Sequence, residues 1–429
     1  MYNSLKCSCV LTSISIAQLI SGSLLAAPLA LTKEQAVAHA LQYNPALNAA
    51  RTTTDQAQGR LQQVGKWQNP SLNLSYATDQ NFNNEGESAY SVGLEQSFPV
   101  TRRLTLQKQI ARNGVGLAQL KIDNRIRLIE CEVGTLFVST VALAEQIKLR
   151  DERLKLGREF VDLMQSRVAT GEVSLLEASQ VQIELYAIEQ EQQALSNEFL
   201  SKRSKLKQLI GANIDSEITL EYQLKLPESA PQLCELTSKL LEEHPEYRMK
   251  KLLYESSEKA VSLAKAERWA DVAVNVFFAE ERGVDEPVGL ETDHFLGVGV
   301  SLPLPLLDQK KGSIQSSRAR QRQIQHELEQ VELRLRSEAC AQKLRVESLY
   351  LQARAYEENF FQMMSETLGE ADAAYRAGQI SLTEFFRLQE QSLRLQSAQL
   401  TALRDFELAM IDWKAATASN NNIQNPLIK

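Results

Sequence analysis

The side chains that could carry out catalysis are scattered along this 429-residue sequence. None of its four histidines stands in the HExxH spacing of a zinc hydrolase, and the sequence has no Walker or nucleophile-elbow motif. The segment GVGVS at residues 297–301 lacks the third glycine of a nucleotide-binding loop and leads into proline. We therefore predict that the chain is not an enzyme and has no catalytic residue, metal site or cofactor. The histidines are His39, His244, His294 and His326.

Two further groups of residues could bind cations, and we assign neither to a site. Residues 280–294 carry six carboxylates and end at His294, a composition that a solvated loop explains better than a metal site. Beyond the N-terminal region the cysteines are Cys131, Cys234 and Cys340. Because their number is odd and no CxxC spacing occurs, they predict neither a disulfide framework nor a thiolate metal site. We interpret them as small residues packed between helices.

The composition is that of a folded protein, with 43% hydrophobic and 24% charged residues. The formal net charge is -7, and Lys and Arg are scattered among Glu. Proteins that bind a nucleic-acid backbone need a concentrated positive face. The sequence therefore argues against nucleic acid as a partner.

The N-terminus has the pattern of an export signal. A mostly apolar run covers residues 10–25, and Ala27 or Ala30 offers a small residue for cleavage. We predict a signal peptide over residues 1–27; the alternative, a buried first helix, is disfavoured by Pro28 and by the Ser and Thr in the run. The cysteines in this region are not placed as in a lipid box, so we expect no lipid anchor. No later window reaches the roughly 18 apolar residues of a membrane-spanning helix.

A ten-residue pattern occurs twice, over residues 168–177 and 375–384, with an offset of 207 residues. In each copy a glycine can end one helix in the left-handed conformation, and a serine three residues later can cap the next. We therefore predict the bends of two long helical hairpins. The matching residues are Gly171 and Gly378, Ser174 and Ser381, Leu175 and Leu382, and Glu177 and Glu384.

The segments around these bends also repeat, at an offset of about 200 residues. Each half is predicted to contain a helix, two strands, a very long helix, a bend and a return helix. The predicted parts are a first repeat at 31–211, a connector at 212–231, a second repeat at 232–418 and a disordered tail at 419–429. In the first repeat we expect a helix at 31–66 interrupted at Asn44-Pro45, strands at 71–77 and 90–98, and helices at 101–170 and 174–210. In the second we expect an interruption at His244-Pro245, strands from 272 and 296, and helices at 311–377 and 382–417. Leu149, Leu156 and Leu163 on one arm, and Val181, Ile188 and Leu195 on the other, keep the seven-residue spacing of a coiled coil.

The four predicted strands point to a membrane. Each is about nine residues long and alternates between an apolar and a polar face, which suits a strand that crosses a bilayer. Four strands cannot close a barrel, and an open edge is not tolerated in lipid, so several chains must contribute to one barrel. Trp67 and Trp269 precede the strands and suit a membrane interface. The alternatives are packing tryptophans and a half-buried sheet in a soluble protein.

Together these features resemble the TolC-like outer-membrane efflux proteins over nearly the whole mature chain. The resemblance rests on the duplication, the two Gly-Ser bends, the strand ends at Phe98-Pro99 and 302–306, and residues 308–312. The strand end LPLPL at 302–306 and the missing lipid-box cysteine are most similar to the CzcC-type cation-efflux branch. The resemblance implies a mainly α fold with a membrane β-barrel part. Long helical hairpins would form a periplasmic coiled-coil barrel, and four strands per chain would contribute to a trimeric 12-strand outer-membrane barrel.

The same resemblance implies partners and site residues. A homotrimer in outer-membrane lipid would meet a periplasmic adaptor at the bends, and the adaptor would couple it to an inner-membrane resistance-nodulation-division pump. Family members line the aperture with acidic residues six and nine positions after the second glycine. Here these positions hold Glu384, matched by Glu177, and Arg387, so a purely acidic ring is not expected. A carboxylate ring would favour cations, whereas Arg387 could pair with Glu384 or with a neighbouring chain. Exposed surface charges are the alternative interpretation.

The function implied is a passive channel of a tripartite efflux system for heavy-metal cations. Drug efflux or type I protein secretion through the same kind of channel is an alternative, and a soluble periplasmic coiled-coil scaffold is an alternative of another class. The sequence does not identify the exported compound, because specificity in such systems resembles a property of the pump.

Overall fold

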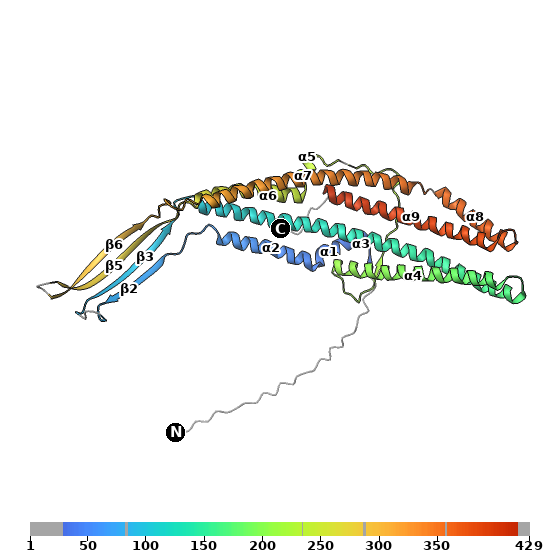
Figure 1. Cartoon of the computed structure of the whole chain (residues 1–429), viewed down its shortest axis with the longest axis horizontal. Helices are drawn as coiled ribbons and strands as arrows, with labels where there is room; N and C mark the ends of the chain where they lie inside the picture. Colours follow the sequence, from blue (N-terminus) through green and yellow to red (C-terminus); the bar gives the residue numbers. More distant parts are fainter. Residues whose placement is uncertain (1–28, 82–84, 234, 286–288, 357, 419–429) are drawn as a thin grey trace, which may run out of the picture.

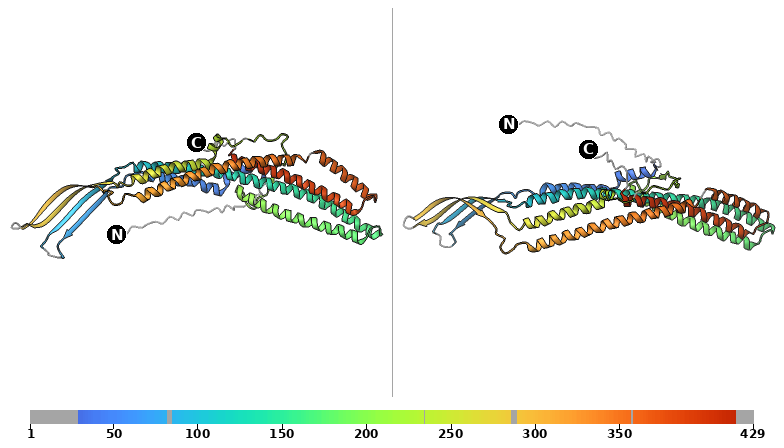
Figure 2. Two further views of the ribbon diagram at one scale, coloured as in Figure 1. Left: turned by 45° about the horizontal axis from the view of Figure 1, so that its top comes forward. Right: turned by 90° about the horizontal axis from the view of Figure 1, so that it is seen from above.

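The structure is a computed structural model that describes residues 29–81, 85–233, 235–285, 289–356 and 358–418. The predicted signal peptide, the predicted C-terminal tail and Cys234 lie outside these residues. The described chain is elongated, with a β-sheet at one end and helices that run along its length to two bends at the other end (Figure 1). Two further views show that the sheet continues the helical body (Figure 2). In chain order the elements are β1 (Leu29–Leu31), α1 (Lys33–Tyr43), α2 (Pro45–Gln63), β2 (Ser71–Thr78), β3 (Ser88–Phe98), α3 (Arg103–Thr170), α4 (Leu175–Ile210), β4 (Ile218–Leu220), α5 (Ser238–Glu243), α6 (Pro245–Ala266), β5 (Val272–Asp285), β6 (Gly289–Ser301), α7 (Lys311–Arg354), α8 (Glu358–Arg376) and α9 (Leu382–Thr417).

The main sheet is antiparallel, with the strand order β2-β3-β5-β6. Its register aligns the apolar faces of the four strands, because Leu72 pairs with Leu94, Leu94 with Val276 and Val276 with Val298. These four side chains are 47–70% exposed. The two repeats thus contribute one hairpin each to a single sheet with one continuous apolar face.

The second hairpin of the sheet is longer than predicted. Glu280 pairs with His294 and Val284 pairs with Leu290, so most of the acidic segment 280–294 lies in β5 and β6. The prediction of a solvated loop there was wrong, because the backbone pairing of the two strands continues through the acidic residues. Residues 286–288 lie outside the described part of the chain.

The predicted interruptions at Asn44-Pro45 and His244-Pro245 are confirmed, and each begins a new helix. The Asn44 side chain accepts a hydrogen bond from the Leu47 amide (3.0 Å), and the His244 ring accepts one from the Glu246 amide (3.2 Å). The first helical segment was predicted to reach Lys66 but α2 ends at Gln63. Gly65 has a φ of +75°, and a Cβ there would lie 2.9 Å from the Leu104 carbonyl oxygen, so the chain turns at this position.

One long helix of the second repeat is broken where the sequence predicts continuity over 311–377. α7 ends at Arg354 and α8 begins at Glu358. The last turn of α7 tightens, since the Ala355 amide also donates to the Gln352 carbonyl (3.3 Å) and the Tyr356 amide to the Ala353 carbonyl (3.2 Å). No proline or glycine marks the break, which is why the sequence did not reveal it.

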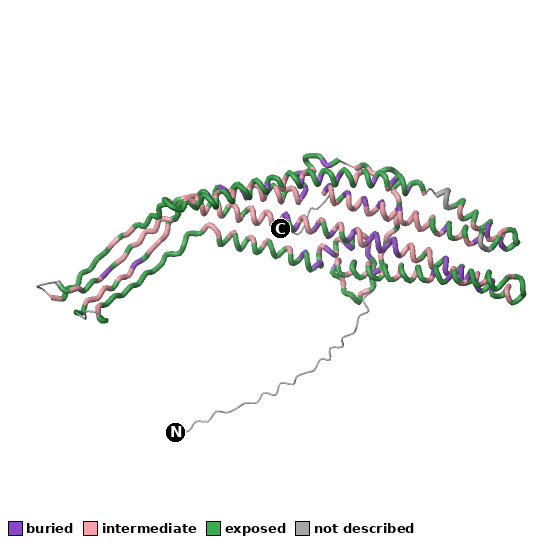
Figure 3. Tube along the Cα trace, in the orientation of Figure 1, coloured by how far each residue is buried: buried purple, intermediate pink, exposed green. Residues whose placement is uncertain are grey.

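The largest buried cluster lies midway along the molecule, where α1 and α2 meet α3 and the end of α4 (Figure 3). Leu47, Ile129, Phe137, Leu206 and Ile210 are at most 1% exposed there. Burial of each such side chain contributes roughly 1.5–3 kcal/mol. The connector after α4 adds the short β4, which pairs in parallel with β1.

Among the described residues, no helix has the length and apolar character needed to cross a membrane.

Candidate functional site: the helical bends and the exposed sheet

The first bend is built as the sequence predicts. Gly171 adopts a left-handed conformation (φ 78°), and its amide and that of Glu172 bond to the last carbonyls of α3 at 3.1 and 3.0 Å. The Ser174 hydroxyl accepts a hydrogen bond from the Glu177 amide (3.2 Å), and the Glu177 carboxylate accepts one from the Ser174 amide (3.3 Å). This reciprocal pair is a capping box, so Glu177 has a structural role at the start of α4. Leu175 beside it is 74% exposed.

The second bend has the same backbone conformation, but the carboxylate of its acidic residue contacts a different group. Gly378 is left-handed (φ 72°), and the Ser381 hydroxyl accepts a hydrogen bond from the Glu384 amide at 3.2 Å. The Glu384 carboxylate lies 3.7 Å from the Arg387 guanidinium within the same chain. Leu382 begins α9, and its side chain lies outside the described part of the structure. The structure thus contains the intrachain pair that the sequence left open, while the aperture role of these residues stays a prediction.

The two bends are held together by aromatic residues, which the sequence analysis missed. The Phe160 ring from α3 lies 5.2–5.6 Å, centroid to centroid, from the rings of Tyr375, Phe385 and Phe386. Aromatic pairs at this separation contribute roughly 0.5–1.5 kcal/mol beyond burial. The only signal in the sequence was the pair Phe385-Phe386 just after the second bend.

The predicted coiled-coil stripe is right for one arm of the first hairpin and wrong for the other. On α4, Val181 and Ile188 are buried. On α3, Leu156 and Leu163 are 54% and 38% exposed, and the buried face carries Leu154, Gly157, Val161 and Met164 instead. The Leu185 side chain would lie only 3.0 Å from a Cβ on Gly157, so this glycine allows α3 and α4 to approach closely. Gly157 follows Leu156 and so lies off the leucine stripe, and this glycine was the sequence signal for the buried face that we missed.

The two predicted interface tryptophans lie at the junction between the sheet and the helices. Trp67 is 61% exposed and contacts Phe98 edge-on, with ring centroids 5.6 Å apart, and Trp269 is 44% exposed. Nearby, the Arg103 guanidinium makes two contacts to the Asp271 carboxylate and so joins the start of α3 to the strand of the other repeat. These positions suit the predicted aromatic belt, which stays a prediction.

No curated protein sequence matches this chain. A family model described as Outer membrane efflux protein matches residues 36–212, which include β2, β3 and the whole first hairpin. The first repeat is therefore similar to the outer membrane efflux protein family. Proteins of this family are channels, which confirms the prediction that the chain is not an enzyme. The resemblance seen in the sequence is thus confirmed for the family, and its cation-efflux branch stays a prediction.

Solved structures of membrane proteins share the fold over nearly the whole chain. CusC is 16% identical, with 90% of this chain and 91% of that chain covered and a TM-score of 0.73. VceC from Vibrio cholerae is 17% identical, with 90% and 95% covered and a TM-score of 0.70. The CmeC outer membrane channel of Campylobacter jejuni is 13% identical, with 90% and 85% covered and a TM-score of 0.73. The second repeat, outside the family match, therefore completes the same fold.

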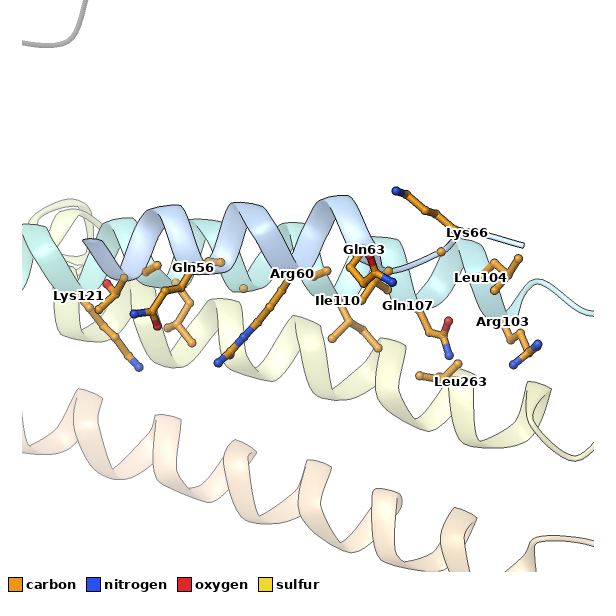
Figure 4. A pocket seen from close by; sticks show the side chains of 18 of the residues that line it. Gln56, Arg60, Gln63, Lys66, Arg103, Leu104, Gln107, Ile110, Lys121 and Leu263 are labelled. Carbon is orange, nitrogen blue, oxygen red and sulfur yellow. The ribbon is translucent and has the colours of Figure 1, made fainter. Parts of the chain in front are cut away.

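The chain also carries a basic groove that the sequence analysis did not find. It has a volume of about 800 Å³ and lies over α3, between α2 and α6, near the sheet (Figure 4). Arg60, Lys66 and Lys121 line it and form no ion pair with any residue in the described ranges, and Leu104 and Ile110 supply apolar surface. The groove is thus opposite in charge to the carboxylates at the bends.

Among their described residues, neither group of cation-binding candidates forms a metal-binding cluster. In the part of the chain that the structure describes, no cluster of three His, Cys, Asp or Glu residues could hold a metal ion. Cys131 is half-buried, and burial raises the pKa of its thiol. Cys340 is exposed, so its interpretation as a packed helix residue was wrong.

Proposed function

We propose that the protein is the outer-membrane channel of a tripartite efflux system, a passive conduit from a periplasmic adaptor and a resistance-nodulation-division pump to the exterior, for heavy-metal cations. The observation that carries this proposal is the sheet, which has one continuous exposed apolar face and two unpaired edge strands, β2 and β6. Large exposed apolar patches mark contact with a partner or with lipid. The two free edges call for further strands.

A trimer would place the apolar face in lipid and would also pair the free strand edges. In lipid, every strand edge must be paired, because no water is present to bind its amides. Single-chain bacterial barrels have at least eight strands, so the four strands of one copy are too few. Three copies supply twelve strands, and channels of this family are trimers that work with an adaptor and an inner-membrane pump.

The helical hairpins supply the rest of the conduit. α3 has 68 residues, and at about 1.5 Å per residue it is roughly 100 Å long. It continues from the sheet to the bends without a break (Figure 1). This arrangement supports a tunnel that crosses the periplasm and presents Gly171, Leu175, Gly378 and Ser381 to the adaptor.

The cargo rests on the sequence resemblance to the cation-efflux branch, at residues 302–306. The exposed Glu177 and Glu384 are placed to attract cations at the bends, but each already has a local partner, the Ser174 amide or Arg387. We therefore assign selection of the metal to the pump and only passage to this channel.

The test is to delete the gene and measure growth on a panel of heavy-metal salts and a panel of drugs, with the channel restored from a plasmid as control. The proposal expects metal sensitivity alone, a heat-modifiable trimer in the outer-membrane fraction and co-purification with a metal-type pump and its adaptor. Drug sensitivity alone would refute the metal cargo. Recovery of a monomer that is soluble without detergent would refute the channel and favour the periplasmic scaffold.

A further inference from the structure

The basic groove over α3 differs in composition from the rest of the chain. Among the described residues that line it, four are Lys or Arg and none is Asp or Glu. The whole chain, in contrast, has 54 acidic and 47 basic residues. Because no carboxylate lines the groove, its charge attracts a negatively charged group. The four cations are Arg60, Lys66, Arg103 and Lys121.

Two of these cations are free and extend in the same direction. Arg103 is paired with Asp271, and Figure 4 shows Lys66 extending away from α6. The side chains of Arg60 and Lys121 form no hydrogen bond or ion pair with any described residue. Figure 4 shows both of them extending toward α6, Arg60 from α2 and Lys121 from α3. Two neighbouring helices thus present unpaired positive charge on the same side of the groove.

The part of the groove nearer the sheet has apolar side chains. Ile110 and Leu104 of α3 and Leu263 of α6 line it. On α3, Ile110 and Leu104 stand 11 and 17 residues before Lys121, or roughly 17 and 26 Å nearer the sheet. Figure 4 shows the same order along the groove, with Lys121 and Arg60 followed by Ile110 and then by Leu263 and Leu104. The free cations therefore lie away from the sheet and the apolar side chains lie toward it.

The apolar end of the groove adjoins the surface that we place in lipid. Lys66 and Gln68 line the groove on either side of Trp67 in the sequence, and Trp67 is one of the two predicted interface tryptophans. Phe98 at the end of β3 is 37% exposed, and Val100 after it is 52% exposed. Exposed apolar side chains thus continue from the end of the sheet toward the start of α3.

We propose that the groove binds one anionic phospholipid, with its phosphate in the part lined by Arg60 and Lys121 and its acyl chains over Ile110, Leu263 and Leu104. A volume of about 800 Å³ is within the range of ligand sites in proteins, which combine apolar walls with a few charged groups. Basic pockets beside a membrane bind the head groups of anionic lipids. The choice of a membrane lipid rests on the proposed function, which places the sheet in lipid.

The orientation of the groove favours a lipid over a small free anion. A free phosphate would use the cations and leave the apolar side chains exposed to water, whereas a phospholipid covers both. Both walls of the groove belong to one chain, so each copy carries a complete site.

The experiment uses native mass spectrometry to count the lipids bound to the purified trimer in detergent as lipid is added. The probe is dioctanoyl phosphatidylglycerol. Dioctanoyl phosphatidylcholine has the same chains without the net charge, and glycerol phosphate has the charge without the chains. We expect one phosphatidylglycerol per chain, bound more tightly than either comparison ligand. Arg60→Gln combined with Lys121→Gln should raise the apparent Kd for phosphatidylglycerol about 25-fold, since each cation near a lipid surface contributes about 5-fold.

Lys108→Gln combined with Arg112→Gln is the matched control. Both residues are exposed on the same stretch of α3 and neither lines the groove, so phosphatidylglycerol binding should not change. Equal binding of phosphatidylglycerol to the wild type and to the Arg60 and Lys121 double variant would overturn the proposal. Phosphatidylcholine bound as tightly as phosphatidylglycerol would also overturn it. Glycerol phosphate bound as tightly would show a site for small anions and would overturn the assignment to lipid.

The outcome is distinguishable from a failure of the proposed channel function. A chain that purifies as a monomer soluble without detergent would refute the channel, and with it the membrane lipid, before any lipid is added. A detergent-solubilised trimer that does not bind phosphatidylglycerol would overturn only the lipid site.

Discussion

Replacing Leu72 with arginine tests whether the exposed face of the sheet lies in lipid. Leu72 is 62% exposed and pairs with Leu94. On β3, Leu94 is four residues from Tyr90 at the outer end of the apolar face and four residues from Phe98 at the inner end. At about 3.4 Å per residue, the row of Leu72 and Leu94 is roughly 14 Å from either end. It therefore lies at the middle of the predicted membrane band.

The position sets the expected magnitude. An arginine on the lipid face of a barrel costs about 2–4 kcal/mol at the bilayer midplane and little near the interfaces. Leu72→Arg should thus destabilise each copy by about 2–4 kcal/mol, and a trimer by about three times as much. The neighbouring Asn73 is exposed on the opposite face of the same strand, so Asn73→Arg should cost close to nothing.

The assay is urea unfolding of the channel in liposomes, together with the heat-induced shift of the trimer in gel electrophoresis. The expected result is a lower unfolding midpoint and less heat-resistant trimer for Leu72→Arg, with Asn73→Arg like the wild type. Equal loss for both variants would show that β2 simply does not tolerate arginine. No loss for Leu72→Arg would refute the placement of this face in lipid.

Three further predictions concern the helices. Burial lowers the pKa of His244 to about 4, below the value of about 6.5 expected in the unfolded chain. As the pH falls, the unfolded state therefore takes up the proton first. The free energy of unfolding should fall by about 3 kcal/mol between about pH 6.5 and pH 4. His244→Asn, which copies Asn44 of the first repeat, should remove this dependence in urea unfolding at pH 7 and 4.5. Glu384→Ala combined with Arg387→Ala should raise single-channel conductance in bilayer recordings, because the 3.7 Å pair at the second bend is lost; unchanged conductance would count against a role in closure. Gly378→Val should impair efflux and adaptor co-purification. A Cβ at this position would meet no atom within 4 Å, but the φ of +72° would cost a valine about 1–3 kcal/mol of backbone strain. Normal efflux and normal adaptor co-purification by this variant would contradict the prediction.

Local signals in the sequence were enough for the bends and the interruptions. Gly171 and Gly378 need a left-handed backbone, and Ser174 and Ser381 bond to amides three residues away, so each feature is decided within one helical turn. The apolar alternation of the strands is similarly local, and it predicted that the strands share one apolar face.

Features decided by distant contacts were not predictable in the same way. The buried face of α3 depends on several neighbours, α4 and α9 among them, so the regular spacing of Leu149, Leu156 and Leu163 selected the wrong side. The Glu384–Arg387 pair was one of several possibilities at the sequence level. The burial of Arg153 depends on packing between two hairpins that are far apart in sequence, and arginine alone gives no sign of it.

The two repeats have the same order of elements, but they differ in the continuity of the long helix and in the contacts at the bend. In the first repeat α3 is unbroken for 68 residues, and Glu177 is fixed to the cap of its own helix. In the second, the long helix divides after Arg354, and Glu384 pairs with the exposed Arg387 instead of completing a capping box. An unbroken helix transmits force along its length, whereas a break allows the part beyond it to turn. If an adaptor binds at the bends, as we propose, the second hairpin is therefore the part of each subunit best suited to move.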